Sequence, residues 1–181
     1  MSRIPVHTVD SAPEASKATL AKMKARYGGR VLNIHAEMAH APIVLEAYAG
    51  MNAAIARHST FDAPTREAIA LAVGAQDECR YCQSAHTAGA VAAGLTEEQT
   101  VAIRTGVVDF DPKLSALLAV AREIAGNVGE VDDKTWAQAV DAGWSDTELA
   151  ELFAHVAANL FTNYFNHYAG TEVDFPLAPG L

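Results

Sequence analysis

The chain has 181 residues, of which half are apolar and 19% are charged, with a formal net charge of -9. This length suits one core of ordinary size, and the excess of acidic residues argues against nucleic acid or an anionic membrane surface as a partner. The sequence has no apolar run long enough to span a bilayer and no secretory signal at its N-terminus, so we expect a cytoplasmic protein that does not enter a membrane.

The apolar residues follow helical spacing, and Gly and Pro fall between these runs, which predicts an all-α fold in a single domain over residues 1–181. Residues 1–11 are expected to form an extended arm, and residues 171–181 a proline-punctuated tail that wraps another surface. Helices are predicted over residues 13–27, 31–38, 42–58, 62–74, 79–93, from residue 96 onward, 112–125, 133–142 and 146–168. In this prediction Gly74 ends the fourth helix.

One short pattern occurs twice, as AVAAGLTEEQ over residues 90–99 and as AVDAGWSDTE over residues 139–148. Both copies share A-V-x-A-G, a Thr or Ser that can cap a helix, and a Gln or Glu three positions later. We therefore expect an internally duplicated helix-turn-helix. The second copy has no cysteine and no equivalent of His86.

The residues that can carry chemistry gather around the only two cysteines, Cys79 and Cys82. In a C-x-x-C pair in the first turn of a helix, the two Cα atoms lie roughly 5 to 6 Å apart, a separation that a disulfide can bridge. His86 lies one turn beyond Cys82 and can act as its base, while the helix N-terminus favours the thiolate. With Glu67 behind the histidine, the pattern predicts redox catalysis by these four residues, with no cofactor and no metal.

The identity of the attacking thiol is a separate question. Cys79 is closer to the helix start, which on position alone makes it the better thiolate. Cys82 is one turn from His86, whereas Cys79 is two turns away and has no sequence-adjacent base. Because a nearby base activates a thiol, our hypothesis is that Cys82 is the nucleophile.

Glu67, eleven intervening residues, Cys79-x-x-Cys82, three intervening residues and His86 together resemble the active-site pattern of one protein family. It is the alkylhydroperoxidase D-like (AhpD-like) branch of the carboxymuconolactone decarboxylase family. The resemblance implies an AhpD-like all-α fold, trimers or hexamers, and reduction of hydroperoxides with electrons from an external dithiol or a disulfide reductase. It also implies that Cys82 is peroxidatic, that Cys79 resolves, and that Glu67 and His86 relay protons. Well-characterised peroxidases of the branch have histidine at the position of Tyr81, a departure that bears on the rate and on the resolving step.

Four other interpretations compete with a peroxidase. A zinc site could use the four candidate residues, although structural zinc sites more often pair two separated knuckles. Two cysteines packed in a core are common, but the coincidence with a histidine and an acid speaks against that. A non-enzymatic redox sensor or adaptor stays open, whereas the lactone decarboxylase activity of the wider family has no use for a dithiol.

The last predicted helix carries His155, Asn159, Asn163 and His167 at steps of four, a polar seam on an otherwise apolar helix. We interpret this seam as buried hydrogen bonding between helices or subunits and leave it out of the site. The arm, the tail and this helix offer more packing surface than one small core needs, which predicts a homo-oligomer.

Overall fold

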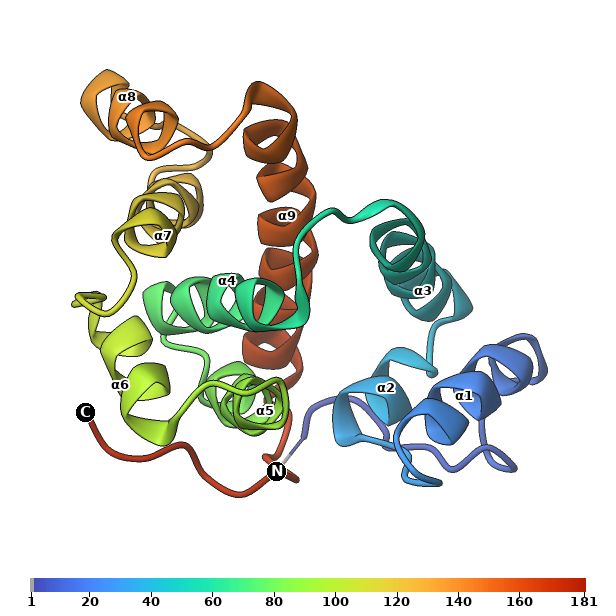
Figure 1. Ribbon diagram of the computed structural model, residues 1–181. Coiled ribbons are helices and arrows are strands. Elements are labelled where there is room, and N and C mark those ends of the chain that lie inside the picture. Colours follow the sequence, from blue (N-terminus) through green and yellow to red (C-terminus); the bar gives the residue numbers. More distant parts are fainter. Residues whose placement is uncertain (1) are drawn as a thin grey trace.

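The computed structural model describes residues 2–181, and this range contains nine α-helices and no strand (Figure 1). The helices are α1 (Glu14–Arg26), α2 (Asn33–Met38), α3 (Pro42–His58), α4 (Ala63–Gln76), α5 (Arg80–Ala92), α6 (Glu97–Thr105), α7 (Pro112–Gly126), α8 (Asp133–Asp141) and α9 (Asp146–Ala169). The predicted all-α class is confirmed, and no helix within the described range is long and apolar enough to cross a bilayer.

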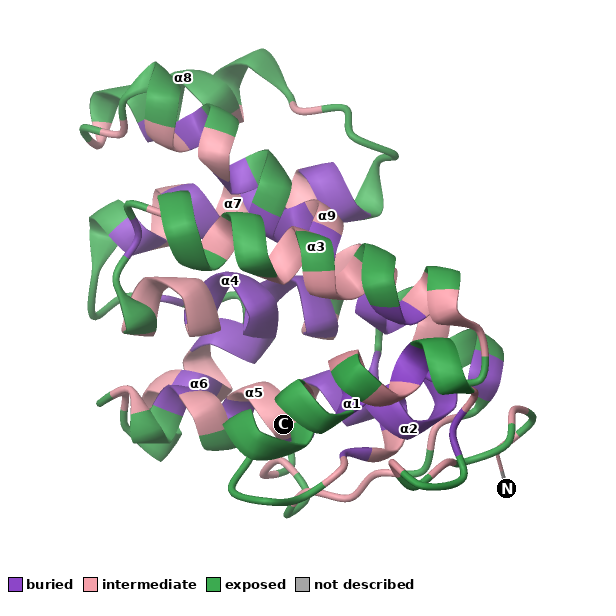
Figure 2. Ribbon diagram, turned by 90° about the vertical axis from the view of Figure 1, so that its right-hand side faces the viewer, coloured by how far each residue is buried: buried purple, intermediate pink, exposed green. Residues whose placement is uncertain are grey.

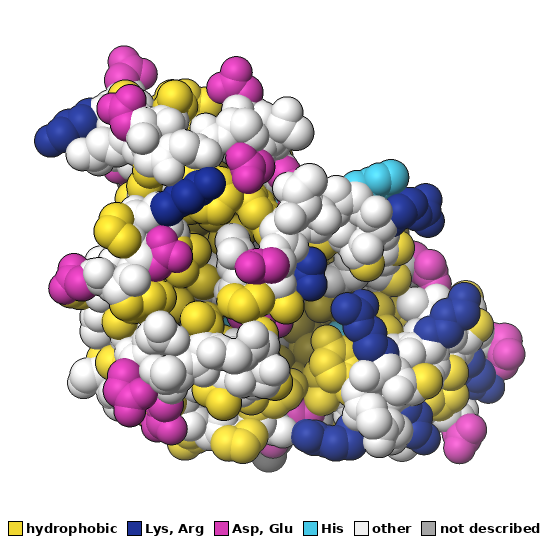
Figure 3. Space-filling view, in the orientation of Figure 1, with side chains coloured by type: hydrophobic (Ala, Val, Ile, Leu, Met, Phe, Trp, Pro, Cys, Tyr) yellow, Lys and Arg dark blue, Asp and Glu magenta, His cyan; other side chains and the backbone are white. Residues whose placement is uncertain are grey.

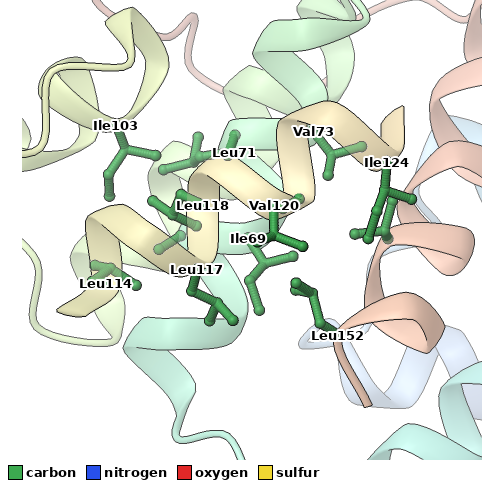
Figure 4. Packing of buried hydrophobic residues seen from close by; sticks show 14 of the residues in the cluster. Ile69, Leu71, Val73, Ile103, Leu114, Leu117, Leu118, Val120, Ile124 and Leu152 are labelled. Carbon is green, nitrogen blue, oxygen red and sulfur yellow. The ribbon is translucent and has the colours of Figure 1, made fainter. Parts of the chain in front are cut away.

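Helix α4 lies at the centre of the larger hydrophobic cluster. Every residue from Ala68 to Gly74 is buried, and this part of the helix packs against α5, α6, α7 and α9 (Figure 2). Each fully buried aliphatic side chain contributes about 1.5–3 kcal/mol to folding. Figure 4 labels ten members of the cluster, Ile69, Leu71, Val73, Ile103, Leu114, Leu117, Leu118, Val120, Ile124 and Leu152.

A second cluster joins α1, α2 and α3 to the beginning of α5. It contains Leu20, Met38 and Leu45 from the three N-terminal helices together with Cys79 and Cys82. The two thiols therefore lie in the cluster where the N-terminal helices meet the rest of the fold.

The arm and the tail pack on their own chain. The Arg3 backbone N–H donates to the Ala169 carbonyl at 2.7 Å, which ties the arm to the end of α9. In the tail, the Asp174 carboxylate accepts hydrogen bonds from the Tyr81 hydroxyl (2.7 Å) and from the Asn33 backbone N–H (3.0 Å). The tail thus covers the outside of α2 and α5.

That residues 1–181 form one domain stays a prediction.

The two copies of the repeated sequence fold into the same turn. Gly94, between α5 and α6, has φ +105°, and Gly143, between α8 and α9, has φ +92°. Each following helix begins with a complete capping box, at Thr96 and at Ser145. The helix-turn-helix geometry is therefore duplicated as the sequence indicates.

The predicted end of α4 at Gly74 is wrong. The helix continues to Gln76, and Gly74 faces α5, where an added Cβ would lie 3.3 Å from the Cβ of Cys82. This glycine allows two helices to approach closely instead of turning the chain, a role that sequence alone does not distinguish from a helix stop.

Candidate active site

The chain reverses direction just before the cysteine helix. Glu78 adopts φ +54°, a left-handed conformation that is uncommon outside glycine. This places Cys79 at the N-cap of α5, where its Sγ accepts the backbone N–H of Cys82 at 3.3 Å. Both cysteines are free thiols and both are 2% exposed. The local fold therefore sets a sulfur atom at the positive end of a helix.

Asn166 of α9 contacts both sulfur atoms. Its Nδ2 lies 3.2 Å from the Sγ of Cys82 and 3.9 Å from the Sγ of Cys79. An amide N–H in this place stabilises negative charge on either sulfur. The predicted polar seam of α9 does not include this residue, because only positions four residues apart were assigned to the seam. Asn166 lies three positions after Asn163, and a helical face alternates steps of three and four.

Glu67 and His86 form a directly bonded pair between α4 and α5. The Nδ1–H of His86 donates to the Oε2 of Glu67 at 2.8 Å, and both side chains are partly buried, at 30% and 29% exposed. Because a carboxylate accepts at Nδ1, the Nε2 atom of the neutral imidazole keeps its lone pair. The two residues are thus in direct contact, an arrangement that suits a base and an orienting acid.

Gly89 makes room for the Glu67–His86 pair, a role that was not predicted from the sequence. A Cβ at this position would lie 2.6 Å from the Oε2 of Glu67, which is closer than Cβ atoms come to non-bonded atoms in proteins. A glycine inside an otherwise regular helix is the signal that could have indicated the close approach.

Cys82, Glu67 and His86 line one cavity of about 560 Å³. Its wall also includes the rings of Tyr48 and Phe175. In Figure 3, hydrophobic side chains line a hollow on this face, and basic side chains lie beside it. Among the described residues, no direct hydrogen bond joins His86 to either sulfur. The four predicted site residues are therefore close together, with the histidine and the Cys82 thiol sharing one space.

The two thiols differ in acidity. The hydrogen bond from the Cys82 thiol, and then that from its backbone N–H, lower the pKa of Cys79 to about 7 against the opposing effect of burial. Burial, followed by the hydrogen bond and the charge of Cys79, raises the pKa of Cys82. The pair therefore holds one negative charge readily and a second one only with difficulty. Acidity favours charge on Cys79, whereas Cys82 is the thiol that lines the cavity.

Three members of the polar seam on α9 contact neighbouring segments, but only two of these, His155 and Asn163, are buried as the sequence predicts. Asn163 donates to the Oδ2 of Asp77 at 2.7 Å, and the Nε2 of His167 lies 2.8 Å from the Asp77 carbonyl oxygen. The Nε2 of His155 lies 3.1 Å from the Ser59 hydroxyl. Asn159 is different, because it donates to the His155 carbonyl within its own helix.

Tyr81 has a structural task. It is buried, its ring packs edge-on against Phe175, and its hydroxyl donates to Asp174, so it fastens the tail over α5. Burial, followed by the hydrogen bond to Asp174, raises the pKa of this phenol, so it stays protonated. The residue therefore takes no part as a base.

A metal site lacks the geometry it would need. Within residues 2–181, no three His, Cys, Asp or Glu side chains converge so that they could hold a metal ion. The Glu67–His86 pair and the two thiols do not form one ligand set, which leaves the zinc interpretation without support.

Comparison with known proteins now bears on this arrangement. Residues 42–123, which include Glu67, both cysteines and His86, match the model of the Carboxymuconolactone decarboxylase family. This part of the chain is therefore similar to the carboxymuconolactone decarboxylase family. The resemblance that the motif indicated is confirmed, and with it a general relation to peroxidase-related proteins.

Solved structures share the fold over nearly the whole chain. An AhpD-core, peroxidase-related protein from Ralstonia eutropha JMP134 superposes with a TM-score of 0.84 at 21% identity, over 96% of this chain and 92% of that one. A peroxidase-related protein from Silicibacter sp. TM1040 gives 0.77 at 17% identity, over 94% and 89%. At these identities the likeness establishes the AhpD-like fold alone.

Two further similarities extend the range of relatives. The debrominase Bmp8, in a cysteine-to-alanine variant bound to 2,3,4-tribromopyrrole, gives a TM-score of 0.81 at 18% identity, over 96% of this chain and 92% of that one. An uncharacterized protein from Haemophilus influenzae is 49% identical over 45 residues, which is 25% of this chain and 40% of that relative. The match thus spans about two fifths of the curated relative.

Proposed function

We propose that this protein is a thiol peroxidase that reduces organic hydroperoxides to alcohols through Cys79 and Cys82. The observation that carries the proposal is the shared cavity, in which the Cys82 thiol and the Glu67–His86 pair line the same wall. A nucleophile, a proton carrier and an orienting acid around one space are what peroxide reduction requires.

In the first step the Sγ of Cys82 attacks the terminal oxygen of the peroxide. The S–O bond forms as the O–O bond breaks, and the departing alkoxide takes a proton from the imidazolium form of His86, which the Glu67 carboxylate stabilises, so that His86 is left neutral. The proton of the Cys82 thiol passes to the Cys79 thiolate, with which it already shares a hydrogen bond. The products are an alcohol, a sulfenic acid on Cys82 and a neutral Cys79 thiol.

In the second step Cys79 attacks the sulfenic sulfur. The S–S bond forms, the S–OH bond breaks, and the Cys79 proton leaves with the hydroxyl as water. A dithiol from outside must then supply two electrons and two protons to restore the thiols. We place this cycle in the cytoplasm, where dithiols stay reduced.

The cavity favours an organic peroxide over hydrogen peroxide. Its wall carries the apolar and aromatic groups of Ile55, Tyr48 and Phe175, and its volume of about 560 Å³ suits a molecule of several rings or a folded acyl chain. Burial lowers the pKa of His35 in this wall to about 4, so that histidine is neutral at physiological pH. Cumene hydroperoxide is therefore a suitable test substrate.

The test is consumption of cumene hydroperoxide with dithiothreitol as the donor. We expect turnover by the wild-type protein, none by Cys82→Ser, and a single reaction by Cys79→Ser that stops as a sulfenic acid trapped by dimedone. A sulfenic acid trapped on Cys79 in the Cys82→Ser protein, with none on Cys82 in the Cys79→Ser protein, would reverse the two roles. A disulfide that forms once with peroxide but is not turned over would instead favour the redox-sensor interpretation.

The fold it shares with a debrominase motivates a second candidate, reductive dehalogenation of a small aromatic compound. The aromatic side chains Tyr27, Tyr48 and Phe175 in the cavity wall suit a planar ring. A dithiol can remove a halogen as halide while it becomes a disulfide. Bromide release from 2,3,4-tribromopyrrole, measured beside peroxide consumption with the same donor, separates the two activities.

We also propose a homo-oligomer, a trimer or a hexamer. Three large side chains on α9 stay exposed in the single chain, with Phe153 at 59%, Tyr164 at 58% and Tyr168 at 70% exposed. An aromatic face of this kind is typical of a surface that a partner covers. Light scattering tests this, and a monomer at micromolar concentration would contradict it.

A further inference from the structure

A second cavity, of about 460 Å³, lies on the other side of the cysteine pair, between the beginning of α5 and the end of α9. Cys79 lines this cavity and Cys82 does not, whereas Cys82 lines the first cavity and Cys79 does not. Tyr81 and Asn166 line both, so they form the wall that separates the two spaces. Each sulfur atom therefore has its own approach.

The second cavity has its own histidine. The Nε2 of His167 lies 2.8 Å from the carbonyl oxygen of Asp77, and because a carbonyl can only accept, this nitrogen carries the hydrogen. The lone pair of the neutral ring is then on Nδ1. His86 is arranged in the opposite sense, with its Nδ1–H bonded to Glu67 and its Nε2 free. Each cavity thus contains one thiol and one histidine with a fixed tautomer.

We infer that the second cavity admits the reducing dithiol, which attacks Cys79 of the disulfide while His167 accepts the dithiol's proton. This rests on the thiol-peroxidase cycle proposed above and names the place where its reductant enters. Other ionisable groups around His167 are Asp77, Glu78, Arg80 and Glu172.

The exchange follows from the direction of attack. A thiolate approaches one sulfur of a disulfide and expels the other, through a mixed disulfide. A donor in the second cavity meets Cys79, so its sulfur bonds to Cys79 as the S–S bond breaks, and Cys82 leaves into the first cavity as a thiolate. The two protons that the donor releases restore the Cys82 thiol and the protonated His86. The donor's second thiol then closes the donor's own disulfide and releases Cys79 as a thiolate. The donor loses two electrons and two protons in all.

Separate entrances have a consequence for turnover. An alcohol product that still occupies the first cavity does not block reduction of the disulfide, because the donor arrives from the opposite side of the wall. Substrate and donor therefore need not compete for one space.

The attacked sulfur can be mapped without peroxide. The protein is oxidised with diamide, freed of oxidant, and treated with 2-mercaptoethanol and iodoacetamide together, after which both cysteines are identified by peptide mass spectrometry. We expect the mercaptoethanol adduct on Cys79 and the carbamidomethyl group on Cys82. An adduct on Cys82, an even division between the two, or failure of diamide to form the disulfide would overturn the inference.

His167→Gln tests the proton transfer. We expect dithiothreitol to reduce the oxidised variant about 10-fold or more slowly at neutral pH, while peroxide oxidises the pre-reduced variant at the normal rate. The deficit should vanish above the pKa of the donor thiol, where no base is needed. A merely structural role would leave the deficit at every pH, and an unchanged rate at neutral pH would equally refute a role for His167. His58→Gln, at the exposed end of α3, is the matched control.

These outcomes are independent of the proposed peroxidase activity. If the wild-type protein consumes no hydroperoxide but the adduct forms on Cys79, the peroxidase proposal fails and the entrance for the dithiol stands. If peroxide is consumed and the adduct forms on Cys82, the reverse holds.

Discussion

Helices α5 and α8 are the two copies of one local design, and they have very different surroundings. Both end at a glycine with positive φ, and the residue after that glycine donates its N–H to the fifth residue before it, Leu95 to Ala90 at 3.0 Å and Trp144 to Ala139 at 3.1 Å. Five residues of α5 are buried, whereas α8 buries Ala139 alone (Figure 2). Identical turn chemistry therefore fixes the local path, and only the neighbours of the helix decide whether it can carry a site.

A glutamate from the preceding helix contacts each copy. In the first copy, Glu67 of α4 accepts the ring N–H of His86 inside a cavity. In the second, Glu123 of α7 accepts the Asp132 backbone N–H at 2.8 Å and the Thr135 hydroxyl at 2.7 Å, at the beginning of α8. The same residue type orients a base in one copy and fastens a helix end in the other.

Replacing each glutamate by glutamine should separate these two roles, and we expect the change in reaction rate to be the largest among these predictions. Glu67→Gln should slow peroxide reduction by about 10²-fold, because an amide no longer stabilises a protonated His86, and it should leave folding little changed. Glu123→Gln should keep the rate and lower the free energy of unfolding by about 0.5–1.5 kcal/mol through one lost hydrogen bond. Steady-state kinetics and urea denaturation of both variants measure this. Equal rates in the two variants would make Glu67 structural.

Gly89→Ala should have a smaller effect on the same pair. The new methyl group needs the place of the Glu67 carboxylate, so that side chain must move away from His86, and we expect the rate to fall about 10-fold. Gly50→Ala is the control, since a Cβ there meets nothing within 4 Å, and it should raise stability by about 0.5–1 kcal/mol with no change in rate. If Gly89→Ala is as active as the control, the close approach does not matter for catalysis.

Thiolate absorbance against pH should reveal the coupling between the two sulfurs. In the wild-type protein one thiolate should appear with a midpoint near the Cys79 pKa of about 7 and be lost as the pH falls below that value. Cys82→Ala removes the hydrogen bond that contributes most to this shift, so the midpoint should move upward. Cys82→Ser keeps an O–H donor and should stay closer to wild type. Identical midpoints in the Ala and Ser variants would show that the thiol hydrogen bond has no part in the shift.

The sequence predicted most of the fold because its signals are local. Prolines at helix starts, the capping boxes and the glycines of the two turns each act within a few residues, and the helix bounds follow from them. The spacing of Glu67, the cysteines and His86 is similarly readable, since it lies in one hairpin. Asn166 escaped prediction because it reaches the sulfurs from a helix 84 residues away in sequence. Gly74 and Gly89 depend on how closely α4 and α5 pack, which no local pattern specifies.

Two residues with strained backbone conformations precede α5 and α8, and replacing them should show the smallest difference between the two copies. Glu78 has φ +54° and Val128 has φ +57°, and a left-handed conformation costs a side-chain-bearing residue roughly 1–2 kcal/mol. Glycine removes that cost but loses about 0.5–1 kcal/mol of its own in chain entropy. Val128→Gly should therefore raise the free energy of unfolding by up to about 1 kcal/mol, a shift in Tm of roughly 2–4 °C.

The two substitutions should nevertheless differ in activity. Val128 is fully exposed and remote from the cavities, so its replacement should leave peroxide reduction unchanged. Glu78 sets the position of Cys79 at the N-cap, and a flexible glycine there should gain similar stability but slow turnover about 2- to 5-fold, because the sulfur is held less firmly. Thermal melts and kinetics of both variants decide the matter. If Glu78→Gly is as fast as Val128→Gly, the strain before α5 is incidental to catalysis and the two copies differ only in what surrounds them.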